Sequence, residues 1–93
     1  MSLNLQLIKN IVESAIFASP LPLSADELLN LFVDEEKPKR QQLQSIIKEL
    51  QNDYATRPLE LVEIASGYRF QVRAKFSPWV SKLWQDKPPR LSR

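Results

Sequence analysis

Acidic side chains are the candidates for catalysis in this 93-residue chain, because carboxylates can act as general acids or bases. They cluster at Asp26-Glu27 and at Asp34-Glu35-Glu36, which we expect to lie at the start of a helix and in a polar loop. No nucleophile, general base or glycine-rich phosphate-binding loop stands beside them in the sequence. The chain has no histidine and no cysteine, so the usual general base, the usual metal ligand and thiolate chemistry are missing. The sequence therefore predicts a protein that is not an enzyme and has no metal or cofactor site.

Polar side chains on a predicted third helix, which begins at Pro38, could instead contact DNA. Glutamine can bond to adenine edges, and arginine or lysine to guanine. The candidate nucleic-acid contacts under this hypothesis are Arg40, Gln44, Lys48 and Arg69. A solvated helix face is naturally rich in the same residue types, and Glu49 and Asp53 on this helix repel phosphate. We therefore expect direct binding of nucleic acid to be weak or absent.

The composition describes one small domain. At 43% apolar and 26% charged residues, it matches ordinary globular proteins. The sequence shows no apolar run long enough to span a membrane and no signal peptide, which favours a cytoplasmic protein. The net charge of +2 is uneven, because residues 1–65 hold six basic and ten acidic side chains and residues 66–93 hold seven and one. Such a basic end can attract phosphate or an acidic partner, or can be a solvated tail.

The stretch that organises the fold is Leu59–Arg73, which we predict to be a β-hairpin. Its β-branched and aromatic residues favour strands. Gly67 is the only glycine of the chain, and it would supply a positive φ in a loop formed by Ala65-Ser66-Gly67. An isolated hairpin is marginal in water, so this hairpin must lie against the helices.

The length of that loop decides which side chains face the helices. A three-residue loop sets Val62 opposite Phe70 and Glu63 opposite Arg69, with the apolar pairs on one face and an ion pair on the other. A two-residue loop would set Glu63 opposite Phe70, so we favour the longer one. The shorter loop remains a rival that would turn Leu61 inward, because one residue of slip exchanges the two faces of a strand.

Four helices are predicted around the hairpin. The first covers residues 3–18 and carries two apolar stripes, and a short extended piece at Leu21 and Leu23 could pair beside the hairpin. Ser24 and Glu27 form a capping box for the second helix. Pro38 suits the first position of the third, and Pro78–Trp84 forms a short fourth. The predicted core residues are Ile8, Val12, Ile16, Leu28, Phe32, Leu43, Ile47, Leu50, Val62 and Phe70.

This order of elements predicts an α+β, mostly helical fold, a winged helix-turn-helix with the hairpin as its wing. Trp79 and Trp84, in the fourth helix, could stack on bases. Large aromatic side chains contribute most in a core or an interface, which is the interpretation we favour.

The sequence resembles the bacterial segregation and condensation protein B (ScpB) family, from the first helix to the last residue. The matching residues are Ile16-Phe17-Ala18-Ser19, Pro22-Leu23-Ser24 with Glu27-Leu28, Leu59-Glu60-Leu61-Val62-Glu63, Gly67-Tyr68-Arg69-Phe70-Gln71-Val72-Arg73, Pro78-Trp79-Val80 and Lys87-Pro88-Pro89-Arg90-Leu91-Ser92-Arg93. Each piece alone is weakly specific, whereas their order and spacing together are fairly specific. The resemblance implies that residues 1–85 form the N-terminal winged-helix domain and that residues 86–93 are a proline-rich linker stub leading to a second domain that is absent here.

The family resemblance also implies a function. It implies a homodimeric, nucleoid-associated adaptor of the SMC–kleisin complex, which binds the kleisin subunit, segregation and condensation protein A (ScpA), and through it SMC, in chromosome condensation and segregation during cell division. The alternative from a different class is a winged-helix DNA-binding transcription regulator. From the residues themselves, we expect the dimer interface to use apolar side chains that the domain core leaves outward. These are Leu7, Ile11, Leu59 and Leu61.

Overall fold

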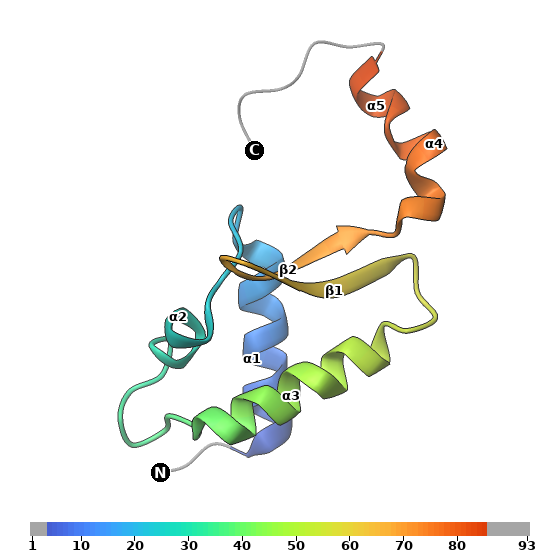
Figure 1. Ribbon diagram of the computed structural model, residues 1–93. Coiled ribbons are helices and arrows are strands. Elements are labelled where there is room, and N and C mark those ends of the chain that lie inside the picture. Colours follow the sequence, from blue (N-terminus) through green and yellow to red (C-terminus); the bar gives the residue numbers. More distant parts are fainter. Residues whose placement is uncertain (1–3, 86–93) are drawn as a thin grey trace.

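The computed structural model describes residues 4–85, so the predicted linker at residues 86–93 lies outside the described residues. Three helices come first, followed by a hairpin and a short helical extension (Figure 1). The elements are α1 (Leu5–Ala18), α2 (Ala25–Leu29), α3 (Arg40–Asp53), β1 (Leu59–Ile64), β2 (Gly67–Val72), η1 (Ala74–Phe76), α4 (Ser77–Val80) and α5 (Lys82–Gln85). This is the mostly helical α+β architecture that the sequence predicts.

Side chains that bond to free backbone amides mark the helix starts. The predicted capping box is confirmed, because the amide of Glu27 donates to Ser24 Oγ at 3.1 Å and the amide of Ser24 donates to Glu27 Oε1 at 2.9 Å. Helix α3 begins at Arg40 rather than at Pro38, and the amide of Lys39 donates to the side chain of Gln42. Pro38 is buried just before the helix, so the prediction that it opens the helix is wrong by two residues.

The core lies where α1, α2 and α3 meet under the hairpin. Its buried apolar side chains are Ile8, Val12, Ile16, Leu28, Phe32, Leu43, Ile46, Ile47, Leu50 and Leu61. Eight of the ten predicted core residues are among them. Of the other two, Phe70 is partly buried and packs against this cluster, whereas Val62 is replaced in the core by Leu61.

The prediction of the hairpin register is wrong. The turn is two residues long, Ala65 and Ser66, and β1 pairs with β2 so that Leu61 lies opposite Phe70 and Val62 opposite Arg69. The rival two-residue loop is therefore the correct length, but it sets Glu63 opposite Tyr68 and not opposite Phe70.

The physical reason for this register is the burial of Leu61. Neighbouring residues of a strand point to opposite faces, so one residue of slip moves Leu61 into the core, where it is 4% exposed, and takes Val62 out of it. Glu63 moves to the helix-facing side with Leu61, and the predicted ion pair between Glu63 and Arg69 has no basis in this pairing.

The extended piece before α2 does pair with the hairpin, as predicted. Leu23 forms an antiparallel bridge with Tyr68 on the free edge of β2. Gly67, next to Tyr68, has a φ of +142° and lies against the backbone of Leu23. Glycine is thus required at residue 67 by the close approach of another segment as well as by its φ.

The helical extension η1–α4–α5 leaves the end of β2 and projects away from the three-helix body (Figure 1). Its residues pack mainly on one another, η1 against α4 and α4 against α5. The radius of gyration is 15.3 Å, compared with about 12 Å expected for a compact chain of this length. The domain therefore consists of a packed body and a projecting segment.

Candidate functional site

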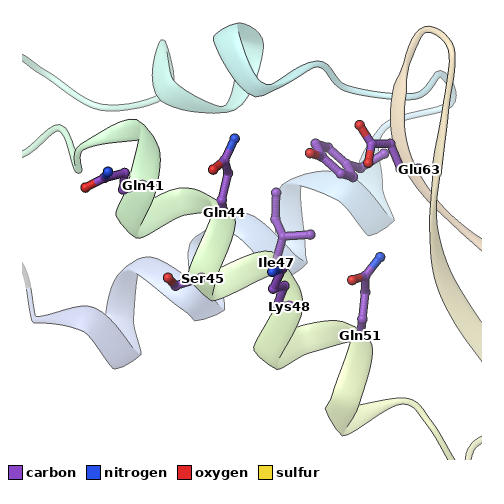
Figure 2. A pocket seen from close by; sticks show the side chains of 8 residues that line it. Gln41, Gln44, Ser45, Ile47, Lys48, Gln51 and Glu63 are labelled. Carbon is purple, nitrogen blue, oxygen red and sulfur yellow. The ribbon is translucent and has the colours of Figure 1, made fainter.

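A polar groove of about 400 Å³ lies between α3 and the wing. Gln44, Ile47 and Gln51 lie on the side of α3 that faces the wing, and Glu63 lies on the opposite wall (Figure 2). The residues that line the groove are Gln41, Gln44, Ser45, Ile47, Lys48, Gln51, Glu63 and Tyr68. Because helix side chains recur every three to four residues, one face of α3 supplies six of these eight.

The charges in this groove balance. Lys48 is the basic residue of its lining and Glu63 the acidic one. Burial, together with the negative charge of Glu63, raises the pKa of Tyr68 above its usual value, while Arg40 opposes that rise. A phenol can both donate and accept a hydrogen bond. An amide-rich groove of this kind suits a polar protein segment better than a polyanion.

The four predicted nucleic-acid contacts do not form one basic surface. Gln44 and Lys48 line the α3–wing groove, whereas Arg40 forms an ion pair with Asp26 of α2. Arg69 lies opposite Val62 in the hairpin, and its guanidinium donates to Gln71 at 3.3 Å. Neutralisation of several phosphates needs several cations along one path, which these four residues do not provide.

A second, apolar groove of about 350 Å³ lies between the C-terminal end of α1, the segment before α2 and the hairpin. Its lining residues are Ile16, Phe17, Ser19, Pro20, Leu21, Pro22, Leu59, Arg69, Phe70, Gln71 and Val72. Phe17, Leu59 and Phe70 also line an adjoining hollow of about 220 Å³ with Glu13, Ser14 and Tyr54. We call the two hollows together the apolar groove.

The apolar groove exposes large hydrophobic side chains. Phe17 and Leu21 are each 71% exposed, and Val72 is also exposed. Contiguous apolar surface on so small a domain usually marks a contact with another molecule. Sequence reasoning missed these three residues, although the signal was present at Ile16-Phe17, because neighbouring residues of a helix cannot both face the same core.

The four residues predicted for a dimer interface lie in different parts of the structure. Leu61 is buried in the core, as the corrected register requires, and cannot offer surface. Leu59 lines the apolar groove. Ile11 packs partly against the core and Leu7 is 42% exposed. Leu7 lies ten residues before Phe17 on α1, about 15 Å away along the helix axis, so it belongs to a different part of the surface.

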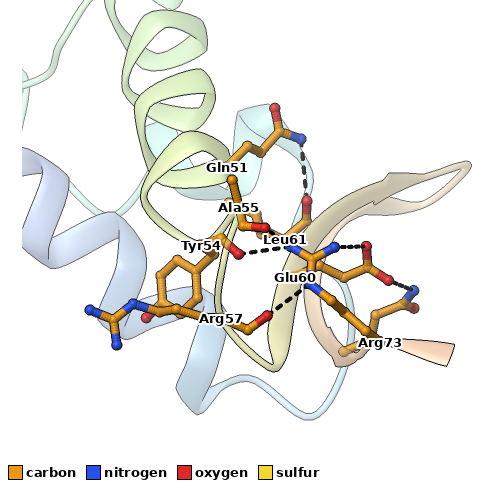
Figure 3. A network of polar contacts seen from close by, with 8 residues as sticks. Gln51, Tyr54, Ala55, Arg57, Glu60, Leu61 and Arg73 are labelled. Carbon is orange, nitrogen blue, oxygen red and sulfur yellow. Dashed lines mark hydrogen bonds and ion pairs between the residues drawn. The ribbon is translucent and has the colours of Figure 1, made fainter. Parts of the chain in front are cut away.

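A network of polar contacts centred on Arg73 joins the end of β2 to the segment after α3 (Figure 3). Its guanidinium donates to the carbonyl oxygens of Arg57 at 2.8 Å and Tyr54 at 2.7 Å, and it forms an ion pair with Glu60 at 3.3 Å. Its backbone amide donates to the carbonyl of Pro58. Arg73 thus bonds to carbonyls of the segment that follows α3 and fixes the end of β2 to that segment.

Two further searches concern metal ligands and membrane-spanning helices in the described residues. Across residues 4–85, no group of three or more potential metal ligands comes together. Within the same range, no helix is long and apolar enough to cross a bilayer.

Three helices followed by a hairpin that packs across them define a winged-helix domain. The family model for segregation and condensation complex subunit ScpB matches residues 10–93. The chain therefore belongs to the ScpB family. It is 44% identical over 85 residues to a segregation and condensation protein B homolog of Coxiella burnetii, a match that covers 91% of this chain and 41% of the relative. The chain thus spans less than half the length of that relative.

Two solved structures share the fold. ScpB from Mycobacterium tuberculosis superimposes with a TM-score of 0.77 at 23% identity, over 98% of this chain and 56% of that one. A dimer of an ScpB N-terminal domain complexed with an ScpA peptide gives a TM-score of 0.71 at 23% identity, over 96% of this chain and 97% of that one. At this identity the likeness concerns the fold, and it supports the N-terminal winged-helix domain as the matching unit.

Proposed function

We propose that this domain is part of a non-catalytic adaptor that binds the kleisin subunit, ScpA, and acts with SMC in chromosome segregation and condensation. The observation that carries the proposal is the family match over residues 10–93. A fold-level neighbour that is a dimer complexed with an ScpA peptide supports both a homodimer and a kleisin partner. A family role at the chromosome supports a cytoplasmic, nucleoid-associated location.

The architecture supports a binding role rather than a chemical one. The two grooves present amide and apolar side chains, and both chemistries suit protein segments. The greater length of the Coxiella relative supports an organisation in which residues 1–85 form this domain and residues 86–93 lead to another. The binding site for kleisin then lies either in this domain alone or across both domains, and the experiment below compares the two.

The proposal is tested by retention of purified ScpA from the same genome on the immobilised 93-residue chain and on the longer two-domain protein. We expect ScpA to be retained by at least the longer protein. The control carries Leu43→Asp, which places a charge at a side chain that is 0% exposed and breaks the core. Equal retention by this control would show adhesion to unfolded chain, and failure of both folded proteins to retain ScpA would reject the function.

A further inference from the structure

We call the projecting segment Ala74–Gln85 the arm. It carries large apolar side chains that the body of the domain leaves exposed. Trp79 is 67% exposed and Leu83 is 62% exposed. They lie four residues apart, Trp79 in α4 and Leu83 in α5, on either side of the turn at Ser81. Among the described side chains of η1 and α4, none is buried. A tryptophan offers one of the largest apolar surfaces of any side chain, so this arm exposes the kind of residue that anchors interfaces.

The arm is too short to gain its helical structure from its own hydrogen bonds. Helices α4 and α5 have four residues each, with a turn at Ser81 between them. Isolated helices below about 12 residues are marginal in water because nucleation is costly. Packing of the Trp79 and Leu83 side chains against another surface would stabilise the helical state of the arm. The arm therefore has the properties of a segment that folds fully against a partner.

The direction of the arm is set by Arg73, the residue that precedes it. The guanidinium of Arg73 donates to carbonyls of the segment after α3 (Figure 3). Its backbone amide donates to the carbonyl of Pro58. These bonds hold the exit from β2 in an orientation from which the arm points away from the body (Figure 1). In this orientation the arm leaves Phe17 and Leu21 of its own body exposed. A partner in another molecule fits this geometry better.

The apolar groove is a surface of matching chemistry. Phe17 and Leu21 stand exposed on its rim, and its lining contains Leu59, Phe70 and Val72. The charged residues of its lining are Glu13 and Arg69. The groove is thus mainly apolar, with one acidic and one basic side chain available at its border.

The charges of the arm and the body are complementary. Residues 74–85 contain Lys75 and Lys82 and no acidic residue, which gives +2. Residues 4–73 contain eight basic and ten acidic side chains, which gives −2. Residues 4–73 as a whole thus carry a net charge opposite to that of the arm, and this attraction favours the encounter of two copies.

From these observations we propose that the arm of one copy docks into the apolar groove of a second copy, and that the two copies exchange arms around a twofold axis. The inference rests on the homodimer of the proposed function and assigns its interface. A twofold arrangement forms each arm–groove contact twice. Each contact would bury the exposed Trp79 and Leu83 of one copy against the exposed Phe17 and Leu21 of the other.

The test is analytical ultracentrifugation of the 93-residue chain over a range of concentrations, with Trp79→Glu as the arm variant and Phe17→Glu as the groove variant. Both residues are exposed, so the substitutions spare the core. Val33→Glu, at a side chain that is 58% exposed and lines neither hollow, is the matched control. Far-ultraviolet circular dichroism and thermal unfolding of every variant confirm that each is folded.

We expect the wild type and the Val33→Glu control to be dimers, and each of the other two variants to dimerise at least tenfold more weakly. A one-to-one mixture of the two variants should regain part of the dimerisation, because a heterodimer keeps one of the two arm–groove contacts intact. Absence of this rescue, or dimers that both variants leave unchanged, would overturn the arm exchange. If ScpA is still retained in either of these two cases, the proposed function stands without the arm exchange. A wild type that is monomeric would overturn both the arm exchange and the homodimer.

Discussion

Leu23 and Tyr68 exchange two backbone hydrogen bonds, of 3.0 and 2.8 Å, that tie the edge of the wing to the segment before α2. This contact brings two chain segments so close that residue 67 has no room for a side chain. A Cβ on Gly67 would lie 2.4 Å from the carbonyl carbon and oxygen of Leu23 and 2.8 Å from the amide nitrogen of Ser24. The stability of the wing therefore depends on one glycine.

Gly67→Ala should be strongly destabilising. The φ of +142° is one that residues with a side chain rarely adopt, which costs about 1–3 kcal/mol, and the clash with Leu23 adds to it. We expect a loss of at least about 2 kcal/mol in the free energy of unfolding, measured by urea denaturation. Ser66→Ala, in the exposed turn, is the control and should change it by less than about 0.5 kcal/mol. A Gly67→Ala variant as stable as this control would show that the bridge can open at little cost.

Leu61→Ala tests the observed register. Because Leu61 is 4% exposed in the core, its truncation should cost about 2–5 kcal/mol. Val62→Ala, on the opposite face of the same strand, should cost clearly less. Denaturation midpoints of the two variants give the comparison. The reverse order would restore the three-residue loop and its faces.

Arg73→Lys should fail to replace arginine in the network behind the hairpin. The guanidinium bonds to several carbonyls and to Glu60 at once, and a lysine ammonium cannot reproduce this planar fork. We expect both Arg73→Lys and Arg73→Ala to lower the free energy of unfolding by about 2 kcal/mol. Arg69→Ala, which removes one 3.3 Å hydrogen bond at the surface, is the matched control. Full stability of Arg73→Lys would mean that charge alone is sufficient there.

Stability should fall as the pH rises above about 10. The hydroxyl of Tyr54 donates to the carboxylate of Glu13, and this bond raises the pKa of Tyr54 above its usual value of 10.0. Since the folded state holds this proton more tightly than the unfolded state, the stabilisation is complete below pH 10 and is lost as the pH passes the folded-state pKa. Burial raises the pKa of Tyr68, and the hydrogen bond to Asp53 raises that of Lys9, so both add a loss of the same sign.

The Tyr54→Phe variant measures how much Tyr54 contributes to the loss of stability at alkaline pH. The variant should be less stable than wild type at pH 7, and the difference between them should shrink between pH 10 and 11.5 in urea titrations. Tyr68 and Lys9 keep part of the alkaline loss in the variant. A wild type whose stability is constant across this range would contradict the role of all three groups.

Binding to random duplex DNA should be weak and should depend only shallowly on salt. The cations of the α3–wing region are dispersed, and Arg40 is already paired with Asp26. A fluorescence-anisotropy titration at several salt concentrations gives the slope of affinity against salt, which is steep only when several phosphates are neutralised. Tight, sequence-selective binding at physiological salt that is lost in Arg40→Ala or Lys48→Ala would favour the transcription-regulator alternative.

The sequence by itself determined the elements and the family. The capping box of Ser24 and Glu27 and the apolar periodicity of the helices depend on residues within one or two turns of each other, so they can be read locally. Most of the core followed from the same periodicity, and the wing followed from its β-branched and aromatic residues. The resemblance to ScpB rested on short pieces whose order along the chain needs no three-dimensional information.

Only the tertiary structure decided the register of the wing, the close approach of Leu23 to Gly67 and the surfaces that remain open. The two registers differ little in local terms, and the choice is made by Leu61 packing into the core and by Leu23 bonding to Tyr68 from 45 residues away along the chain. The Arg73 network likewise joins groups 13 to 19 residues apart. Such contacts are set by the meeting of distant segments, and no pattern of neighbouring residues contains them.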